Sequence, residues 1–354
     1  MTRFTLFLLF ILALQPMHAQ TLDDTQWSRL EDWQTHAGPA RMEVGVMQEG
    51  KITWYSVLKD TILINQPTEL YYEIGSITKP LMGLALQKYL EEVPGDLETP
   101  VSEWLPDTLE WAGNGTDPIR LRHLVTHQSG MPRMPGNLQK SLRNPFDPFS
   151  NYQPSHLFSY LEAWEPARAP EEGFEYSNLA AGLATYAALL HSDLSLDSYT
   201  NQYLLQPLGL QEISYDIPDS LGILPYHTQG YKSVRWHFTE TLAGAGAMRG
   251  TASGMGDLLQ KLAAPSPENQ AWISRSTASL SNSEVGTFCT FWIRDGIDGT
   301  DKSYIWHNGQ TQGYETFLAW VEGEETGLVI LSNRAAEKVT PLGMAWIQEL
   351  GKTP

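Results

Sequence analysis

Strand-like segments lie at both ends of this sequence, and helix-like segments fill its middle. Near the start, the apolar and alternating runs in RMEVGVMQEGKITWYSVL are typical of a hairpin that turns at Glu49 and Gly50. After about residue 285, the runs GTFCTFWIRDG, SYIWHNG, GYETFLAWVEG and TGLVILSN again have the character of strands. The simplest arrangement pairs both sets in one antiparallel sheet. We therefore predict an α/β (α+β) fold, with an antiparallel sheet flanked by helices and an inserted all-helical lobe.

The same pattern sets the expected domain boundaries. Residues 20–95 and 255–354 are expected to form a discontinuous sheet lobe, and residues 96–254 the helical lobe. The middle contains helix-like runs at 177–192 and 196–210. A cleft between two lobes is the usual place for a functional site, so we expect the site there.

Composition and the N-terminus restrict the possible partners and location. A net charge of −18 argues against nucleic acid and anionic membrane surfaces as partners. Residues 1–19 combine a positive start, a largely apolar stretch at 4–14 and a small-residue end, which is typical of a signal peptide. The apolar stretch is shorter than the roughly 20 residues that span a bilayer. We therefore expect a periplasmic or secreted protein with no stable membrane span after cleavage. The lone Cys289 cannot form an intramolecular disulfide and is interpreted as a buried strand thiol.

Two Ser-x-x-Lys pairs occur, Ser56–Lys59 and Ser76–Lys79. The first lies on a predicted strand, where residues three apart point to opposite faces. The second, in EIGSITKP, lies at a predicted helix start, where residues i and i+3 share a face. There the lysine amine can reach the serine hydroxyl, and unpaired backbone N–H groups can face the atom that is attacked. Pro80 is expected to make this first turn 3₁₀-like. Alone, the pair would be interpreted as an ordinary helix start, so it needs context.

Two further motifs provide that context. A lysine base must lose its proton, and lowering its pKa from about 10.4 to near 7 requires roughly 4.6 kcal/mol. A tyrosine that shares the proton reduces this requirement. EEGFEYSNLAAGL places Tyr176 and Asn178 at a loop-to-helix junction, where side chains face a cleft. IWHNGQTQGYETF places His307 at a strand end and then Gly309, which would allow a substrate backbone to lie along that edge.

Other chemistries have less support. The Gly-x-Ser-x-Gly elbow of α/β-hydrolases and the His-Glu-x-x-His zinc motif are absent from the sequence. His123 and His127 have the spacing of two ligands on one helix face, but no obvious third ligand accompanies them. We therefore predict no metal and no cofactor, and a small-molecule or peptide substrate.

Taken in order, the motifs at 76–79, 176–178 and 307–309 resemble those of the serine beta-lactamase and penicillin-binding protein superfamily. The resemblance is greatest to the class C beta-lactamase-related hydrolases, which carry Ser-x-x-Lys, Tyr-x-Asn, and Lys-Thr-Gly or a His-x-Gly variant. LRHLVTHQSGMP, PEEGFEYSNLAAGL, LLQPLGL and HNGQTQGYETFLAW also follow the order of that family. The resemblance covers nearly the whole mature chain.

This resemblance implies a beta-lactamase/transpeptidase-like fold and an acyl-enzyme mechanism. Ser76 would attack an acyl carbonyl, while Lys79 and Tyr176 handle its proton and deliver it to the leaving group; which of the two is the base stays open. Asn178 would hold Lys79 and the substrate amide. The backbone N–H groups of Ser76 and Gln310 would form the oxyanion hole, and water would then cleave the acyl-enzyme.

The third motif departs from the Lys-Thr-Gly of beta-lactamases proper. His307, with an ordinary pKa near 6.5, is mostly neutral at pH 7 and holds a substrate carboxylate less well than lysine. Arg249 is a candidate for the missing charge. In the family, His-type motifs occur in D-amino-acid peptidases and esterases. We therefore expect an exported serine hydrolase acting on esters or D-amino-acid peptides, as a carboxylesterase or D-Ala-type peptidase, with beta-lactam hydrolysis weak or absent. The alternative is a non-catalytic or slow-turnover penicillin-binding protein that binds cell-wall peptides.

Overall fold

The computed structural model describes residues 22–352, except 37, 39, 115, 116, 284, 285, 336 and 337. The expected signal peptide at 1–19 lies outside the described residues. Within the described ranges, no helix is both long and apolar enough to cross a bilayer. The same ranges contain no cluster of three or more His, Cys, Asp or Glu side chains suited to a metal ion.

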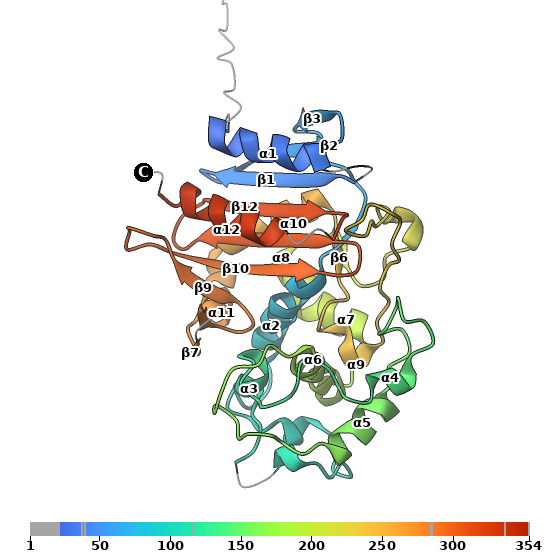
Figure 1. Ribbon diagram of the computed structural model, residues 1–354. Coiled ribbons are helices and arrows are strands. Elements are labelled where there is room, and N and C mark those ends of the chain that lie inside the picture. Colours follow the sequence, from blue (N-terminus) through green and yellow to red (C-terminus); the bar gives the residue numbers. More distant parts are fainter. Residues whose placement is uncertain are drawn as a thin grey trace, which may run out of the picture.

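The predicted antiparallel sheet is confirmed, and it is built from both ends of the chain (Figure 1). The first strand of the chain pairs with the last, with Val44 opposite Ile330. The predicted hairpin also forms, and Glu49 and Gly50 turn it with positive φ angles of 50° and 71°. In the described residues the sheet has nine strands in the order β3 (Thr61–Ile64), β2 (Lys51–Leu58), β1 (Met42–Gln48), β12 (Gly327–Ser332), β11 (Glu315–Val321), β10 (Ser303–Gln310), β9 (Ile293–Gly296), β8 (Gly286–Phe288) and β7 (Ser281–Ser283).

Helices cover both faces of this sheet, which explains why β11 and β12 are buried along their whole length instead of alternating between buried and exposed residues. On one face, Phe317 and Ile330 pack in a core with α1 (Asp24–His36) and α12 (Val339–Leu350). On the other face, the neighbouring residues of the same strands join a larger core that includes α10 (Ala252–Ala263) and the helical middle of the chain. In Figure 1, α12 lies in front of the sheet and the fainter α10 behind it.

The helical middle is centred on α6 (Asn178–Ser192), in which every residue from 179 to 189 is buried. The helix predicted at 196–210 is formed by α7 (Leu196–Thr200), a single π-helical segment η4 (Asn201–Leu205) and α8 (Gln206–Leu208). Apart from η1 and α2, which are described below, the other described helices and short turns are η2 (Val101–Trp104), η3 (Ala112–Asn114), α3 (Leu121–Val125), α4 (Leu138–Ser141), α5 (Pro154–Ala163), η5 (Asp219–Leu221), α9 (Glu240–Ala243) and α11 (Pro267–Thr277).

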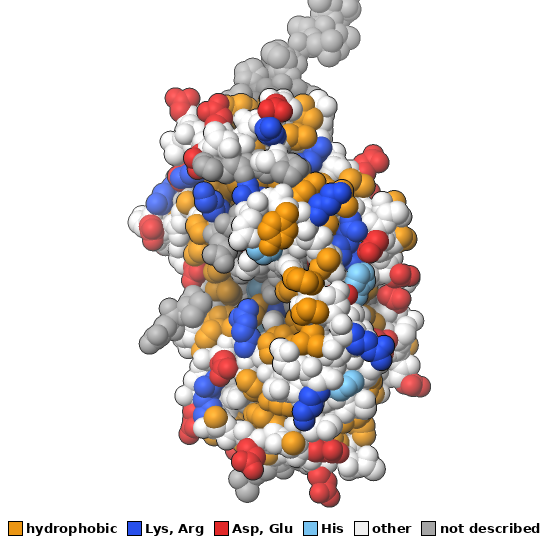
Figure 2. Space-filling model, turned by 45° about the vertical axis from the view of Figure 1, so that its right-hand side comes forward, with side chains coloured by type: hydrophobic (Ala, Val, Ile, Leu, Met, Phe, Trp, Pro, Cys, Tyr) orange, Lys and Arg blue, Asp and Glu red, His pale blue; other side chains and the backbone are white. Residues whose placement is uncertain are grey.

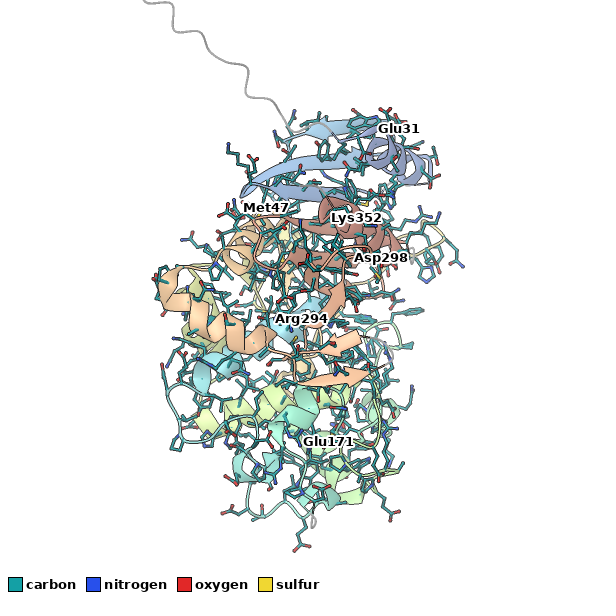
Figure 3. All side chains as sticks on the ribbon, turned by 90° about the vertical axis from the view of Figure 1, so that its left-hand side faces the viewer. Glu31, Met47, Glu171, Arg294, Asp298 and Lys352 are labelled. Carbon is teal, nitrogen blue, oxygen red and sulfur yellow. The ribbon has the colours of Figure 1, made fainter. Side chains whose placement is uncertain are left out.

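The surface carries charges of both signs, and hydrophobic side chains gather at mid-height on one face. Figure 2 shows this orange region between the sheet part above and the helical part below. Figure 3 shows another side, where exposed charged residues such as Glu31 and Lys352 on the sheet part and Glu171 on the helical part stand at the outer surface. The hydrophobic region lies at the level where the two parts meet.

The predicted 3₁₀ turn is present as η1 (Gly75–Ile77), and it continues directly into α2 (Thr78–Tyr89). Pro80 lies in the first turn of α2, where a missing N–H is tolerated because the first N–H groups of a helix have no intrahelical partner. The segment before η1 is held by a second small sheet of three strands, β4 (Tyr72–Glu73), β6 (Arg249–Gly250) and β5 (Ile213–Ser214). The turn is therefore fixed on both sides.

The end of β10 lies against η1 because two glycines have no side chain. A Cβ on Gly309 would lie 2.0 Å from the Ile74 carbonyl oxygen and 2.3 Å from Thr316 Oγ1. A Cβ on Gly75, whose φ is +53°, would lie 2.7 Å from the Gln310 nitrogen. The Thr316 hydroxyl donates a hydrogen bond of 2.9 Å to the Ile74 carbonyl and ties the sheet to the turn.

We predict that Gly309→Ala destabilises the protein by about 1–3 kcal/mol, because its methyl group has no space between Ile74 and Thr316. Urea unfolding measures this free energy. Gly296→Ala is the matched control, since a Cβ there meets nothing within 4 Å in the same sheet. Equal unfolding free energies for the two variants would show that the close approach is not a constraint.

Candidate active site

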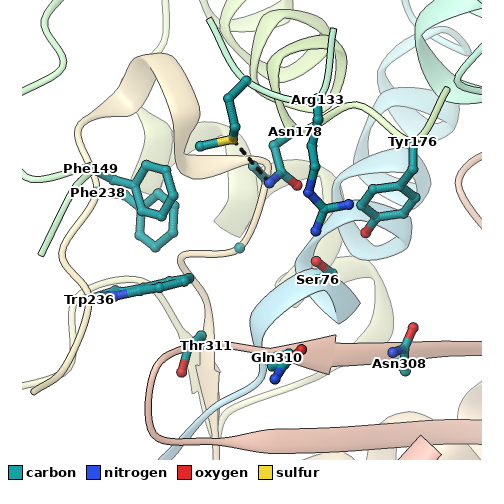
Figure 4. A pocket seen from close by; sticks show the side chains of 13 residues that line it. Ser76, Arg133, Phe149, Tyr176, Asn178, Trp236, Phe238, Asn308, Gln310 and Thr311 are labelled. Atoms are coloured by element: carbon teal, nitrogen blue, oxygen red, sulfur yellow. Dashed lines mark hydrogen bonds between the residues drawn. The ribbon is translucent and has the colours of Figure 1, made fainter. Parts of the chain in front are cut away.

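A pocket of about 550 Å³ lies where η1, the end of β10 and the helical middle meet (Figure 4). Four of the residues predicted from the sequence line it: Ser76, Tyr176, Asn178 and Gln310. Ser76 is partly exposed, so a bound molecule can reach its hydroxyl. The expected cleft between the sheet and the helical part is therefore present, and the three motifs meet there.

The hydroxyl of Ser76 contacts both predicted proton-handling groups. Lys79 Nζ lies 2.8 Å from Ser76 Oγ, and Tyr176 also makes a side-chain hydrogen bond with Ser76. Lys79 is fully buried, and its Nζ donates a second hydrogen bond of 2.6 Å to the carbonyl of Ala245. Its Nζ also lies 4.9 Å from the centre of the Tyr176 ring. The three side chains thus form one connected group around the exposed hydroxyl.

Burial shifts the pKa values of Lys79 and Tyr176 in opposite directions, and both shifts favour the neutral side chain. Loss of solvent lowers the pKa of Lys79 well below its usual value, and the positive charge of Arg133 lowers it further. Burial raises the pKa of Tyr176 to about 12, against the opposing effects of the Ser76 hydrogen bond and Arg133. Lys79 is therefore shifted toward the neutral amine, whereas Tyr176 keeps its proton at neutral pH.

Asn178 lines the pocket, but its expected contact with Lys79 is absent from the described structure. Its side-chain nitrogen points to the sulfur of Met134 at 3.3 Å, whereas Lys79 Nζ bonds Ser76 and the Ala245 carbonyl. The amide of Asn178 therefore faces the pocket and the neighbouring loop rather than the amine.

The third motif reaches the site, but the side chain of His307 does not line the pocket. His307 is buried behind the pocket wall, with its ring centre 6.3 Å from that of Tyr176 and its Nδ1 2.5 Å from the Asn308 carbonyl oxygen. Burial, and then the charge of Lys79, lower the pKa of His307 to about 3. His307 and Gly309 are not lining residues; Asn308 and Gln310 are. Gly309 instead permits the contact between β10 and Ile74.

The register of β10 directs the backbone N–H of Gln310 toward the pocket. Thr311 N donates to the carbonyl of Tyr314, so in the antiparallel ladder the backbone groups of Gln310 point away from β11. On that other side, β9 pairs with β10 only as far as Trp306. The N–H of Gln310 therefore lies on the edge of β10 that pairs with no described strand at this point, next to the turn that carries Ser76.

Arg133 is a pocket residue that sequence analysis missed. Its guanidinium carbon lies 5.2 Å from the centre of the Tyr176 ring, and its side chain is exposed. It directly follows Pro132, the last residue of the segment LRHLVTHQSGMP that resembles a family motif. This position beside a motif is the feature of the sequence from which Arg133 could have been identified. The prediction that Arg249 supplies the charge missing from the third motif was wrong. Arg249 is buried, forms ion pairs with Asp219 and Glu73, and lies outside the pocket lining.

His127 holds Tyr176 in place and is not one of two ligands on a helix face. α3 ends at Val125, and His127 follows it with a φ of 58°. Its Nδ1 accepts a hydrogen bond from the N–H of Ser177 at 3.2 Å, and its carbonyl accepts one from the N–H of Glu175 at 3.0 Å. Its ring centre lies 4.5 Å from that of Tyr176. His127 thus binds the residues on both sides of Tyr176 and packs on the ring between them.

Three aromatic rings form the opposite wall of the pocket. The ring centres of Phe149 and Phe238 are 4.6 Å apart in a stacked arrangement, and Trp236 meets Phe149 edge-on at 5.1 Å. Glu73 supports this wall, since its Oε1 accepts a 2.8 Å hydrogen bond from the N–H of Trp236. Burial raises the pKa of Glu73 to about 7, and a hydrogen bond from Thr311 opposes this shift.

Glu73 should make stability depend on pH. Its raised pKa means that the folded protein holds this proton more tightly than the unfolded chain, so the stabilisation is complete below about pH 4.5 and is lost as pH rises through 7. We predict that Glu73→Gln removes a pH-dependent loss on the order of 2–3 kcal/mol between pH 5 and pH 8. Thermal or urea unfolding at these pH values measures it.

The exposed carboxylate of Glu110 provides the control, and Glu110→Gln should keep the wild-type pH dependence. If Glu73→Gln also keeps it, the buried carboxyl is not the titrating group.

Comparison with known proteins places this geometry in a family. Residues 14–349 match the family model described as Beta-lactamase. A Beta-lactamase from Yersinia enterocolitica is 28% identical over 193 residues, which are 54% of this chain and 46% of the relative, so the alignment spans about half the relative's length.

Two solved structures share the fold. The class C beta lactamase from Rhodobacter sphaeroides has a TM-score of 0.72 at 19% identity, covering 92% of this chain and 98% of the other. The Beta-Lactamase/D-Alanine Carboxypeptidase from Pseudomonas syringae has a TM-score of 0.76 at 17% identity, covering 94% and 99%. With one family model accounting for 14–349 and the fold shared over nearly its whole length, the chain belongs to the beta-lactamase family of serine hydrolases.

Proposed function

We propose that this protein forms an acyl-enzyme through Ser76 and hydrolyses esters or D-amino-acid peptides, as a carboxylesterase or D-Ala-type peptidase. The observation that carries the proposal is the 2.8 Å contact between Ser76 Oγ and the buried Lys79 Nζ at the pocket. A serine hydroxyl is a weak nucleophile until a base removes its proton. A lysine that burial shifts toward the neutral amine is such a base.

Acylation begins when Ser76 Oγ attacks the substrate carbonyl and its proton passes to Lys79. The carbonyl oxygen becomes an oxyanion, which the backbone N–H groups of Ser76 and Gln310 bind. The bond to the leaving group then breaks, and the leaving oxygen or nitrogen receives the proton from Lys79 through the Tyr176 hydroxyl. The products of this half-reaction are the Ser76 ester and a neutral alcohol or amine.

Deacylation repeats these steps with water. A water molecule attacks the ester carbonyl and gives up a proton to the same Lys79 and Tyr176 pair, and Ser76 Oγ recovers a proton as it leaves. The acid is released and the enzyme returns to its starting state. Lys79 is the proton acceptor in both halves, because Tyr176 with a pKa of about 12 keeps its own proton at neutral pH.

The lining of the pocket supports esters or peptides over beta-lactams. The family's lysine of Lys-Thr-Gly is replaced by His307, which is neutral, buried and outside the lining. The Pseudomonas syringae structure of the same fold is named as a D-alanine carboxypeptidase as well as a beta-lactamase. The aromatic wall of Phe149, Trp236 and Phe238 suits an apolar acyl group. The protein would act after export, with residues 1–19 as its signal peptide.

Replacing the nucleophile tests the proposal. We predict that Ser76→Ala lowers the rate of p-nitrophenyl acetate hydrolysis on the order of 10³-fold or more, because no acyl-enzyme can form. Intact mass after acid quench should show an acetyl adduct on the wild type and none on the variant. Ser274→Ala, at an exposed serine on α11, is the control and should hydrolyse the ester like the wild type.

Benzylpenicillin provides the second arm of this experiment. Slow or absent hydrolysis without a lasting adduct agrees with the proposal, whereas a stable adduct on Ser76 would favour the slow-turnover penicillin-binding protein. Full ester hydrolysis by Ser76→Ala would contradict the proposed nucleophile.

The pH profile separates the two proton-handling groups. Because the neutral amine is the active form, kcat/KM should rise with pH through the lowered pKa of Lys79. We predict that Tyr176→Phe reduces kcat/KM by about 10²–10⁴-fold but keeps this rise, while Lys79→Met loses it. Stopped-flow ester hydrolysis from pH 5 to 10 measures both. The opposite pattern, in which Tyr176→Phe alone abolishes the rise, would make the tyrosine the base.

A further inference from the structure

Arg133 is a cation in the pocket that has no acidic partner in the described structure. The chain has 41 acidic residues and a net charge of −18, and most of its other described arginines pair with carboxylates, as Arg29 does with Glu349 and Arg294 with Glu322. No hydrogen bond or ion pair joins the Arg133 guanidinium to a described residue, and no Asp or Glu lines the pocket. An arginine left unpaired at a site in such an acidic protein indicates an anion supplied by the bound molecule.

The position of Arg133 is fixed by the same elements that carry the catalytic groups. Its carbonyl oxygen accepts a 2.9 Å hydrogen bond from the N–H of Asn178 at the start of α6. Its guanidinium lies over the Tyr176 ring, and Figure 4 shows it between Asn178 and Tyr176, above Ser76. Because Tyr176 passes the proton to the leaving group, Arg133 lies at the leaving-group end, away from the aromatic wall.

We propose that Arg133 determines specificity by binding a carboxylate on the leaving group of the substrate. The inference rests on the proposed function and names its substrate class: an ester or peptide whose departing portion, such as a terminal amino acid, carries a free carboxylate. A guanidinium presents two parallel N–H donors that match the two oxygens of a carboxylate. Lys79, His307 and Arg249 are each buried and engaged or neutral, so none of them offers this charge to the pocket.

A bound carboxylate would also assist the reaction itself. The charge of Arg133 opposes protonation of Lys79, and it acts in the same direction on the buried His127. A carboxylate paired with Arg133 offsets that repulsion at the step when Lys79 takes the serine proton. The leaving-group charge is therefore expected to raise kcat as well as lower KM.

A matched pair of thioesters tests this inference. One is phenylacetylglycyl thioglycolate, whose leaving thiol carries a carboxylate, and the other is the same compound with that carboxylate changed to a primary amide. We predict that wild-type kcat/KM is on the order of 10- to 100-fold higher for the carboxylate. In Arg133→Gln this ratio should fall to near one, and Arg133→Lys should keep an intermediate ratio because the charge remains without the bidentate geometry.

Arg143→Gln is the control for net charge, since Arg143 is exposed and outside the lining. It should keep the wild-type ratio. An unchanged ratio in Arg133→Gln, or a wild-type ratio near one, would overturn the inference while the hydrolysis itself would still support the proposed function.

Binding in the Ser76→Ala background gives a readout that does not depend on turnover. Calorimetry should show tighter binding of the carboxylate compound than of the amide, and adding Arg133→Gln should remove the difference. If the wild type hydrolyses neither compound but this binding preference is present, the proposed function fails and Arg133 remains the anion-binding residue. No preference in the Ser76→Ala background would count against the inference directly.

Discussion

The close approach of β10 to the turn that carries Ser76 is the constraint on which the rest of the site depends. Gly75 and Gly309 leave space for it, and the hydrogen bond from Thr316 to the Ile74 carbonyl fixes it. The contact brings the backbone N–H of Gln310, on the edge of β10 that has no paired strand there, next to the serine. It also joins the sheet, made from the two ends of the chain, to η1 and α2.

Burial at this junction shifts the pKa values of the basic side chains behind Ser76. The packing that closes the space behind Ser76 removes Lys79, His127 and His307 from water, and the pKa of each is lowered. The buried amine and imidazoles are therefore shifted toward their neutral forms, while Arg133 remains as a cation at the pocket. This division allows one amine to accept a proton near neutral pH and leaves a separate charge available for recognition.

The local chemistry of the site could be predicted from the sequence because it depends on short spacings. Ser76 and Lys79 meet because residues three apart share one side of a helix start, and Tyr176 and Asn178 lie at the N-terminus of α6 because Ser177 caps it. Apolar runs at both chain ends likewise predicted the antiparallel sheet. Which neighbour each side chain contacts was harder to predict from the sequence. Asn178 contacts Met134 instead of Lys79, and His307 is buried behind the pocket wall.

The sequence by itself determined which residues share a helix turn or a strand end, since those relations follow from backbone geometry within a few residues. Only the tertiary structure decided which cation reaches the pocket. Arg249 and Arg133 have the same side chain, but Arg249 lies on a short strand beside the carboxylates of Glu73 and Asp219. The guanidinium of Arg133 instead lies over the ring of Tyr176, with no such carboxylate beside it in the described structure. Whether a charge is paired or available depends on groups far away in the chain that folding places beside it, and spacing along the sequence does not contain that information.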